Sequence, residues 1–357
     1  MTTYEDAARE RADSLIKTGR ATILAIETSC DETAAAVVRD GRTVLGAAVH
    51  TQIPLHEKYG GVVPELASRS HVERIGPVVA QALESAGATL ETIDAVAVTY
   101  GPGLVGALLV GVSYAKGLAL AKKLPLVGVN HIFGHVAANY LTYPELEPPF
   151  VCLVASGGHT HLLLIEDYIS CRLLGRTRDD AAGEAFDKVA RALGLGYPGG
   201  PKLEALARQG DPNRYAFHAG FNAGQGLDMS FSGVKTAVVN LLHNAGQKGE
   251  TLDHADIAAS FERSVVETLA HKSVLAAGAA NVRKLALAGG VSANQALRAR
   301  MEQQAKRAGL TFYTPKMEYC TDNAAMIGCA GHYALLAGRR DSLALNACPQ
   351  LSLKAQD

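Results

Sequence analysis

Two histidines separated by one helical turn are the residues of this sequence with the clearest chemistry. His131 and His135 lie in the run NHIFGH at residues 130–135. Side chains at positions i and i+4 of a helix share one face, so two imidazoles can hold one divalent ion between them. In the H-E-x-x-H motif of zinc peptidases the residue after the first histidine is a glutamate base, but here it is Ile132. The spacing indicates a metal site without a peptidase base; two ordinary histidines on a half-buried helix are the alternative.

Two segments place polar residues at the end of an apolar run. Residues 21–38 predict a strand, the polar turn ETSCDET and a second strand, while residues 150–165 predict a strand, the turn SGGHT and another strand. Such hairpin turns can offer carboxylates, hydroxyls and backbone N–H groups to a ligand, although a plain polar turn is the alternative. Their repetition predicts an internal duplication.

Other predicted elements position the remaining polar groups. A strand at residues 125–129 leads into the histidine helix, and a strand at 285–288 leads through GGVSAN into a helix at 295–308, whose N-terminus can face an anion. Asp322 precedes an apolar helix predicted at 324–337. It is suited to capping that helix, and it is equally a carboxylate that could complete a metal site.

The run GPGLVG at residues 101–106 matches the G-x-G-x-x-G motif of dinucleotide-binding folds. Two features oppose that function. Pro102 removes an N–H donor from the turn, and lysines 122 and 123 stand where an acidic residue should hold a ribose. The helix predicted at 105–120 is rich in glycine and alanine, so it is a candidate packing or partner surface.

Composition limits the class of protein. The chain has 357 residues, 48% hydrophobic and 19% charged, which suits a soluble protein of two domains. The net charge of −1 creates no global attraction to nucleic acid or membrane, so RNA contacts would need basic clusters such as those in residues 172–178 or 298–307. Six cysteines without a C-x-x-C pair indicate a reducing compartment. The charged N-terminus is not typical of a signal peptide, and the apolar run 104–115 is too short to span a bilayer.

Ten motifs occur in order across residues 26–328. They are IETSCDET, GGVVPELASRSH, GPGLVGALLVG, HIFGH, SGGHT, GEAFDKVA, YPGGP, FSGVKTA, LAGGVSAN and YCTDNAAMIG. Together they resemble the tRNA threonylcarbamoyladenosine transferase family, once called O-sialoglycoprotein endopeptidases. The resemblance implies the actin/Hsp70/sugar-kinase-like (ASKHA) α/β fold, with two duplicated domains around a cleft. We therefore expect an N-terminal extension (1–20), a first domain (21–133 with 323–350), a second domain (134–322) and a tail (351–357).

The resemblance also implies site residues. One divalent ion per subunit, iron or alternatively zinc, is expected on His131, His135 and Asp322. Asp31 and Glu32 of the first turn are candidates for catalytic work. Contacts to threonylcarbamoyl-adenylate, or to an adenine nucleotide in the cleft, are implied for Val154, Ala155, Ser156, Gly157, Gly158, Asp187, Gly200 and Asn294. Among these, the Asp187 carboxylate would accept from ribose hydroxyls and Gly200 would leave space for the ring.

The implied reaction is transfer of threonylcarbamoyl from its adenylate to the N6 amine of the adenosine 3′ of the tRNA anticodon, with release of AMP. Backbone N–H groups of the SGG turn would stabilise developing charge, and Asp31 or Glu32 would take the proton. Many relatives have valine at position 155, and the alanine here removes no polar group. The implied partners are tRNA, a non-catalytic paralogue of the same fold and a small P-loop ATPase, in the cytoplasm and without a membrane.

The residues present disfavour three other functions. A metallopeptidase is disfavoured by the missing base after His131, and a small-molecule kinase by the absence of a D-x-G-T pattern in the first turn. A non-catalytic scaffold resembling the family's shorter paralogue would lack the metal-binding residues, whereas this chain has all three.

Overall fold

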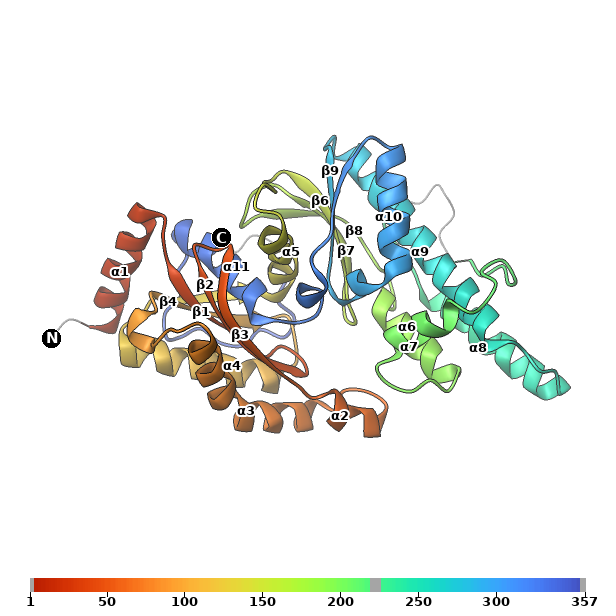
Figure 1. Cartoon of the computed structure of the whole chain (residues 1–357), viewed down its shortest axis with the longest axis horizontal. Coiled ribbons are helices and arrows are strands. Elements are labelled where there is room, and N and C mark those ends of the chain that lie inside the picture. The colour runs from red at the N-terminus through yellow and green to blue at the C-terminus, as the bar shows by residue number, and fades with distance from the viewer. Residues whose placement is uncertain (1–2, 219–225, 354–357) are drawn as a thin grey trace. The chain divides into compact units, whose positions relative to one another are not determined.

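The computed structural model describes residues 3–218 and 226–353, and the chain divides into two compact α/β units (Figure 1). Unit 1 comprises Met1–Pro148, Asp167–Ser170 and Pro315–Asp357, and unit 2 comprises Pro149–Glu166 and Cys171–Thr314. These divisions differ from the boundaries expected at 133/134 and 322/323. The whole histidine helix belongs to unit 1, because it packs along the last helix of the chain there.

Unit 1 contains a five-stranded mixed sheet with the order β3-β2-β1-β4-β5. The strands are β1 (Thr22–Glu27), β2 (Glu32–Arg39), β3 (Thr43–Thr51), β4 (Ala95–Gly101) and β5 (Leu126–Asn130). The first three strands are antiparallel, and β1, β4 and β5 are parallel. The alternation of side chains along β1 sends Leu24 and Ile26 into one apolar core, while Ala25 meets Gly328 on the opposite face. Both faces of β1 are therefore covered, which explains its continuous apolar run.

The helices of unit 1 cover both faces of that sheet. They are α1 (Tyr4–Thr18), α2 (Ile53–His56), α3 (Pro64–Ser85), α4 (Val105–Lys122), α5 (His131–Thr142) and α11 (Ala324–Leu336), with 3-10 turns at Glu57–Tyr59, Leu90–Thr92 and Met317–Tyr319. Helix α1 forms most of the N-terminal extension. Its Ala8, Ala12 and Leu15 are buried, and Arg11 donates to the Ile93 carbonyl at 2.7 Å, so the extension is docked on unit 1.

Helix α4 is long and apolar enough to cross a membrane by length and composition. Its Val112, Ala115 and Ala119 instead pack into the core of unit 1. Gly111 also faces inward, because a Cβ atom there would collide with the Thr28 hydroxyl. The small residues of this helix thus serve close packing inside the unit.

Unit 2 repeats the sheet topology of unit 1, with the order β10-β9-β6-β7-β8. Its strands are β6 (Phe150–Ala155), β7 (Thr160–Ile165), β8 (Cys171–Arg176), β9 (Lys284–Ala288) and β10 (Thr311–Tyr313). The central strand β6 pairs antiparallel with β7 and parallel with β9, as β1 pairs with β2 and β4. Both predicted hairpins are confirmed, and the duplication is visible in the strand order.

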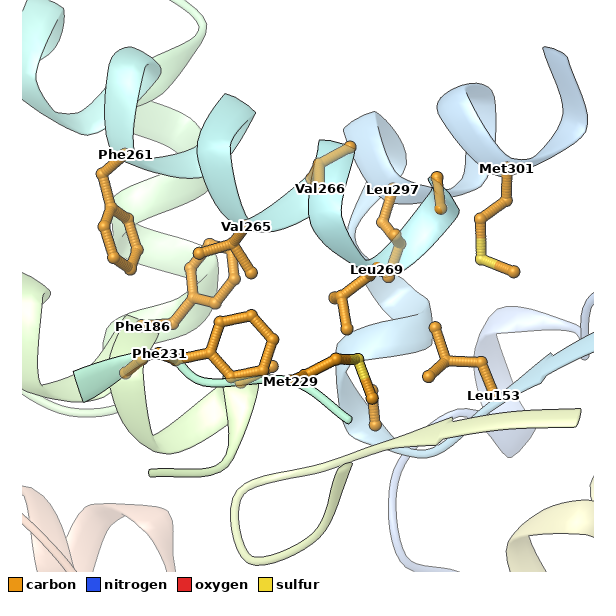
Figure 2. Packing of buried hydrophobic residues seen from close by; sticks show 14 of the residues in the cluster. Leu153, Phe186, Met229, Phe231, Phe261, Val265, Val266, Leu269, Leu297 and Met301 are labelled. Carbon is orange, nitrogen blue, oxygen red and sulfur yellow. The ribbon is translucent and has the colours of Figure 1, made fainter. Parts of the chain in front are cut away.

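The helices of unit 2 build one large apolar core (Figure 2). They are α6 (Ala182–Ala192), α7 (Gly199–Ala207), α8 (Ser232–Lys248), α9 (His254–Ala279) and α10 (Gln295–Arg307), with a 3-10 turn at Gly290–Ala293. Phe186 of α6 meets Phe261 of α9 edge-on, with ring centroids 5.3 Å apart. Helix α6 begins at Ala182, and Asp179 just before it accepts hydrogen bonds from the backbone N–H groups of Phe231 and Ser232.

The residues after α11 pack on unit 1. Asp341 donates its N–H to the Leu126 carbonyl at 2.8 Å, and Cys348 donates to the Tyr100 carbonyl at 2.7 Å. Gly103 donates to the Pro349 carbonyl at 3.2 Å, so this segment covers the GPG turn and uses an N–H that a nucleotide would need. The expected tail thus packs on unit 1 as far as residue 353, and residues 354–357 lie outside the described part.

Candidate metal centre and glycine-rich turn

His131, His135 and Asp322 meet in unit 1, with one ligand atom of each lying within 4.8 Å of the others. The Nε2 atoms of His131 and His135 lie 3.4 Å and 3.3 Å from the same oxygen, Oδ1 of Asp322. The rings stand edge-on, with centroids 4.6 Å apart. The helical spacing therefore produces the shared face predicted from the sequence, and a segment distant in the chain adds the carboxylate.

Two helix N-termini position these ligands. Asn130 caps α5 by accepting from the Ile132 N–H at 2.9 Å, so His131 opens the helix where β5 ends. Asn323 caps α11 by accepting from the Met326 N–H at 2.9 Å. The expectation that Asp322 is the natural cap is therefore wrong: its neighbour performs that task, and the Asp322 carboxylate is directed toward the histidines.

The donor set fits a metal ion. Both ring nitrogens of His135 are buried and make no hydrogen bond within residues 3–218 and 226–353. Buried polar atoms are rarely left without a partner, and a cation between the three side chains would supply one for Nε2. Two imidazole nitrogens and one carboxylate oxygen are typical ligands of zinc and iron.

The two histidines differ in charge preference. Burial alone would lower the pKa of His131, but the carboxylates of Asp322 and Glu27 raise it to about 9. Burial lowers the pKa of His135, and the neighbouring His131 lowers it further. His135 therefore presents a neutral imidazole. His131 lies between two carboxylates, with Glu27 beside Nδ1 and Asp322 beside Nε2.

Glu27 is a member of this cluster that sequence reasoning missed. Its side chain is fully buried, and Oε2 lies 3.1 Å from Nδ1 of His131. Burial would raise its pKa, yet His131 holds the pKa of the carboxyl below its usual value. The available signal was a single charged residue closing the otherwise apolar strand TILAIE.

Asp31 and Glu32 follow β1 in the first polar turn. Thr51 donates its hydroxyl to Oε1 of Glu32 at 2.9 Å, while Oε2 is buried without a hydrogen-bond partner among the residues that the structure describes. Burial raises the pKa of Glu32 to about 8; the Thr51 hydroxyl opposes this shift, and the carboxylates of Asp31 and Asp322 add to it. The Ser29 hydroxyl of the same turn lies 3.2 Å from Nδ1 of His131, which places the turn beside the metal centre.

His71 fixes that turn. Its Nδ1 lies 2.8 Å from the Thr33 hydroxyl, and its Nε2 lies 2.9 Å from the Cys30 carbonyl oxygen. Both ring nitrogens of His71 therefore contact the turn itself, which is a structural role rather than a ligand role.

The glycine-rich turn of unit 2 joins β6 to β7. Ser156 donates its N–H to the His159 carbonyl at 2.8 Å, and its hydroxyl accepts from the His159 N–H at 3.2 Å. Gly157 and Gly158 are exposed, and a Cβ atom on either would meet nothing within 4 Å. Val154 and Ala155 have no exposed side-chain surface, so they hold the turn in place from within the sheet.

Asp187 and Gly200 come together beside this turn. Oδ1 of Asp187 accepts from the N–H groups of Gly199 at 2.9 Å and Gly200 at 3.2 Å, which anchors the start of α7. Gly183, at the start of α6, donates to the Ser156 carbonyl at 3.2 Å, so the helix that carries Asp187 abuts the turn.

Asn294 is held on both sides of its amide. It donates to Oε1 of Glu262 at 2.6 Å and accepts from the Leu297 N–H at 2.8 Å, which caps α10. Burial raises the pKa of Glu262 to about 7, and the Asn294 hydrogen bond opposes that shift. The adjoining Gly289 packs on the Ala155 carbonyl, so the ends of β6 and β9 lie at one edge of the sheet. Unit 2 therefore gathers the residues implied in donor binding along this edge.

The chain is similar to proteins of one family over most of its length. A family model described as tRNA N6-adenosine threonylcarbamoyltransferase matches residues 43–329. A protein of that name from Clostridium botulinum (strain 657 / Type Ba4) is 54% identical over 331 residues, covering 93% of this chain and 97% of the relative. Another, from Moorella thermoacetica, is 56% identical over 333 residues with the same coverage, 93% and 97%.

Solved structures with low sequence identity share the fold. HypF of T. kodakarensis has a TM-score of 0.60 at 16% identity, over 89% of this chain and 48% of that chain. Component A of (R)-2-hydroxyglutaryl-CoA dehydratase from Acidaminococcus fermentans has a TM-score of 0.54 at 15% identity, over 88% and 99%. These neighbours confirm the predicted ASKHA fold class. The sequence matches show that the chain belongs to the tRNA N6-adenosine threonylcarbamoyltransferase family.

Proposed function

We propose that this chain transfers the threonylcarbamoyl group of threonylcarbamoyl-adenylate to the N6 amine of the adenosine 3′ of the tRNA anticodon. The N6 nitrogen forms a bond to the carbamoyl carbonyl carbon, the bond from that carbon to the phosphate oxygen breaks, AMP leaves and the amine loses a proton. Family membership supports the transferase activity. The observation that carries the site assignment is the cluster of His131, His135 and Asp322 beside a carboxylate-bearing turn.

The cluster is proposed to hold one divalent ion per subunit, iron or alternatively zinc. When bound, such an ion supplies a Lewis acid and an anchor for substrate oxygens. The three side chains would provide the ligands from the N-termini of α5 and α11, with both histidines buried and Asp322 half-buried.

Glu32 is our preferred general base, with Asp31 as the alternative. An attacking aromatic amine must give up a proton, and a base is most effective when its pKa lies near the working pH. The pKa of about 8 for Glu32 meets that condition, and its Oε2 has no hydrogen-bond partner to displace within the described ranges.

Donor binding is proposed for the edge of unit 2 that carries the glycine-rich turn. The exposed backbone of Gly157 and Gly158 can approach the reacting carbonyl and stabilise its developing charge through N–H groups. Asp187 orders the N–H groups of Gly199 and Gly200, which supports the proposed nucleoside contacts there. The remaining proposed contacts are Val154, Ala155, Ser156 and Asn294.

We expect Gly157→Ala to fold normally and to bind threonylcarbamoyl-adenylate more weakly, because its added methyl group meets open space in the protein but occupies the ligand's side of the turn. Gly183→Ala is the contrasting variant. Its Cβ would lie 2.6 Å from the Ser156 carbonyl oxygen, so it should lower the melting temperature. Thermal unfolding and calorimetric titration of both variants test this. Wild-type donor affinity in Gly157→Ala would remove the turn from the donor site.

The proposed partners are tRNA, a non-catalytic paralogue and a small P-loop ATPase, in the cytoplasm. The small residues of α4 were expected to form the paralogue surface, but Ala107 and Gly111 are buried inside unit 1. The large apolar side chains of α4 that are exposed are instead Val105, Leu109 and Leu120, at 54%, 41% and 52%. On the neighbouring helix α3, Val72 is 64% exposed. We place the paralogue on this α3/α4 face.

Changing Val105 and Leu109 together to aspartate should abolish pairing with the paralogue while the metal content stays unchanged. Each apolar side chain lost from an interface weakens pairing by roughly 10-fold or more. Val239→Asp is the matched control, because Val239 is a 43% exposed valine on α8 of unit 2. Co-purification of the tagged paralogue with each variant measures the effect. Retained pairing in the double variant would exclude this face.

Basic clusters expected to contact tRNA are partly neutralised in the structure. Arg172 pairs with Glu166 at 3.4 Å, and Arg178 pairs with Asp228 at 2.9 Å. These pairs are exposed, and exposed pairs contribute little stability, so an RNA phosphate can replace the carboxylate at small cost.

The decisive experiment is transfer of labelled threonylcarbamoyl from its adenylate to tRNA by the metal-loaded protein with its partner proteins. The expected product is N6-threonylcarbamoyladenosine in the nucleoside digest, and a tRNA with guanosine 3′ of the anticodon is the control. Absence of the modified nucleoside, with AMP release unchanged by tRNA, would contradict the proposed reaction.

A further inference from the structure

Glu27 is a buried carboxylate that lies beside one ligand of the candidate metal centre, His131. Its side chain is 0% exposed at the end of β1. Oε1 accepts from the Ser29 N–H at 2.5 Å, and Oε2 accepts from the Thr99 hydroxyl at 2.6 Å. Oε2 also lies 3.1 Å from Nδ1 of His131. A buried charge is costly unless it is paired and hydrogen-bonded, so this carboxylate is retained for an interaction that an apolar residue could not make.

The geometry assigns His131 one tautomer. Nε2 of His131 faces Asp322 at 3.4 Å, whereas Nδ1 faces Glu27. An ionised carboxylate can accept hydrogen bonds but cannot donate them. Glu27 therefore places the proton of His131 on Nδ1 and leaves the Nε2 lone pair for an ion. The Ser29 hydroxyl, 3.2 Å from the same Nδ1, is the competing partner. Nδ1 of His135 has no hydrogen-bond partner in the described parts of the chain, so the two ligands are held differently.

The charges of the cluster also indicate that Glu27 contributes to binding a divalent ion. If a divalent cation is bound, both imidazoles are neutral, and Glu27 and Asp322 together supply the two negative charges that balance the cation. Without Glu27, the cation, Asp322 and the two histidines would carry one positive charge in excess. Glu27 and both histidines are buried, so an unbalanced charge beside them would be costly.

We propose that Glu27 is a positioning residue of the metal centre, which orients His131 through Nδ1 and supplies the second negative charge that a divalent cation requires. This inference rests on the metal centre proposed above. Glu27 contacts the metal ligand His131 and would not contact the ion or the substrate. Changing Glu27 should therefore alter the affinity for metal, which can be measured without the transfer reaction.

The test is the affinity of the purified full chain for Zn²⁺ and Co²⁺, measured by competition with a chromophoric chelator. Glu27→Gln preserves shape and removes the charge. We expect it to bind both ions roughly 10- to 100-fold more weakly, the usual effect of changing the partner of a histidine ligand. The visible absorption of the Co²⁺ form should also shift, because the orientation of His131 is released. Unchanged affinity and an unchanged spectrum would overturn the inference.

Two further variants keep the test decisive if Glu27→Gln does not fold. Thr99→Val removes one hydroxyl donor to Glu27 and keeps the side-chain shape, so a smaller loss of affinity in the same direction is expected. Ser29→Ala should leave affinity unchanged, and a loss there without a loss in the Thr99 or Glu27 variants would make Ser29 the orienting partner and overturn the inference.

Asp341→Asn is the matched control. This carboxylate is also in unit 1 and accepts from the Gly128 N–H at 2.6 Å. Its change to an amide should leave metal affinity intact, and an equal loss in this variant would overturn the assignment to Glu27. If the wild-type chain binds neither Zn²⁺ nor Co²⁺, the proposed metal centre itself is refuted. If the wild type and the Glu27→Gln variant bind these ions with equal affinity, only the inference about Glu27 is refuted.

Discussion

Alanine at His131, His135 or Asp322 is expected to remove the bound metal and abolish transfer while the protein stays folded. Each change leaves two of three ligands, and two ligands rarely retain a metal ion in a protein. The fold should persist because the cluster lies at the N-termini of α5 and α11, outside the apolar core of unit 1. Elemental analysis beside circular dichroism and the transfer assay measures all three quantities.

Asn323→Ala is the control that separates the metal from the helix cap. It removes the hydrogen bond to the Met326 N–H, so it should cost about 0.5–2 kcal/mol of stability. It should nevertheless retain the metal. Asp322→Ala should show the reverse pattern. Full metal content in Asp322→Ala would exclude that residue from the site, and normal transfer by a folded, metal-free variant would show that the ion is not needed for the chemistry.

A glutamine at position 32 is expected to slow transfer by roughly 10²- to 10⁴-fold, the usual contribution of a general base. In the wild type, a proton must leave Glu32 before it can accept one from the substrate amine. With a pKa of about 8, the rate should rise with pH and level off above that value. The Glu32→Gln variant should lose this rise. Single-turnover rates across this pH range provide the measurement.

Asp31→Asn is the comparison that identifies the base. If it abolishes the pH dependence and Glu32→Gln does not, the base is Asp31. Stability gives a second readout. Since the pKa of Glu32 is raised by folding, its contribution to stability is complete below its unfolded pKa and is lost as pH rises through about 8. Relative to wild type, Glu32→Gln should therefore gain stability above that pH, measurable by denaturant unfolding.

The strands and turns that carry the site could be predicted from the sequence, because their signals are local. Apolar runs ending in polar turns marked β1 and β6, and the four-residue spacing placed His131 and His135 on one face. The repeated hairpin also revealed the duplication, which the strand order of both sheets confirms.

What could not be predicted depends on contacts between distant segments. Asp322 and Asn323 are both good capping residues, and only the direction of the chain into α11 decides that Asn323 accepts the hydrogen bond. Glu27 ends an apolar strand, where a carboxylate would ordinarily reach solvent, and its burial depends on Thr99 and His131. Helix α4 is apolar all round, so its sequence does not distinguish the packed face from the exposed one.

Unit 1 is assembled from both ends of the chain, whereas most of unit 2 is continuous between Pro149 and Thr314. During synthesis from the N-terminus, β1, β4 and the histidine helix leave the ribosome long before α11, which packs on all three. Asp322 emerges in that last segment. A nascent chain can therefore complete the apolar core of unit 2 first, and it cannot hold the proposed metal ion with all three ligands until residue 322 has been translated. Chains that stop before this residue would lack the proposed centre.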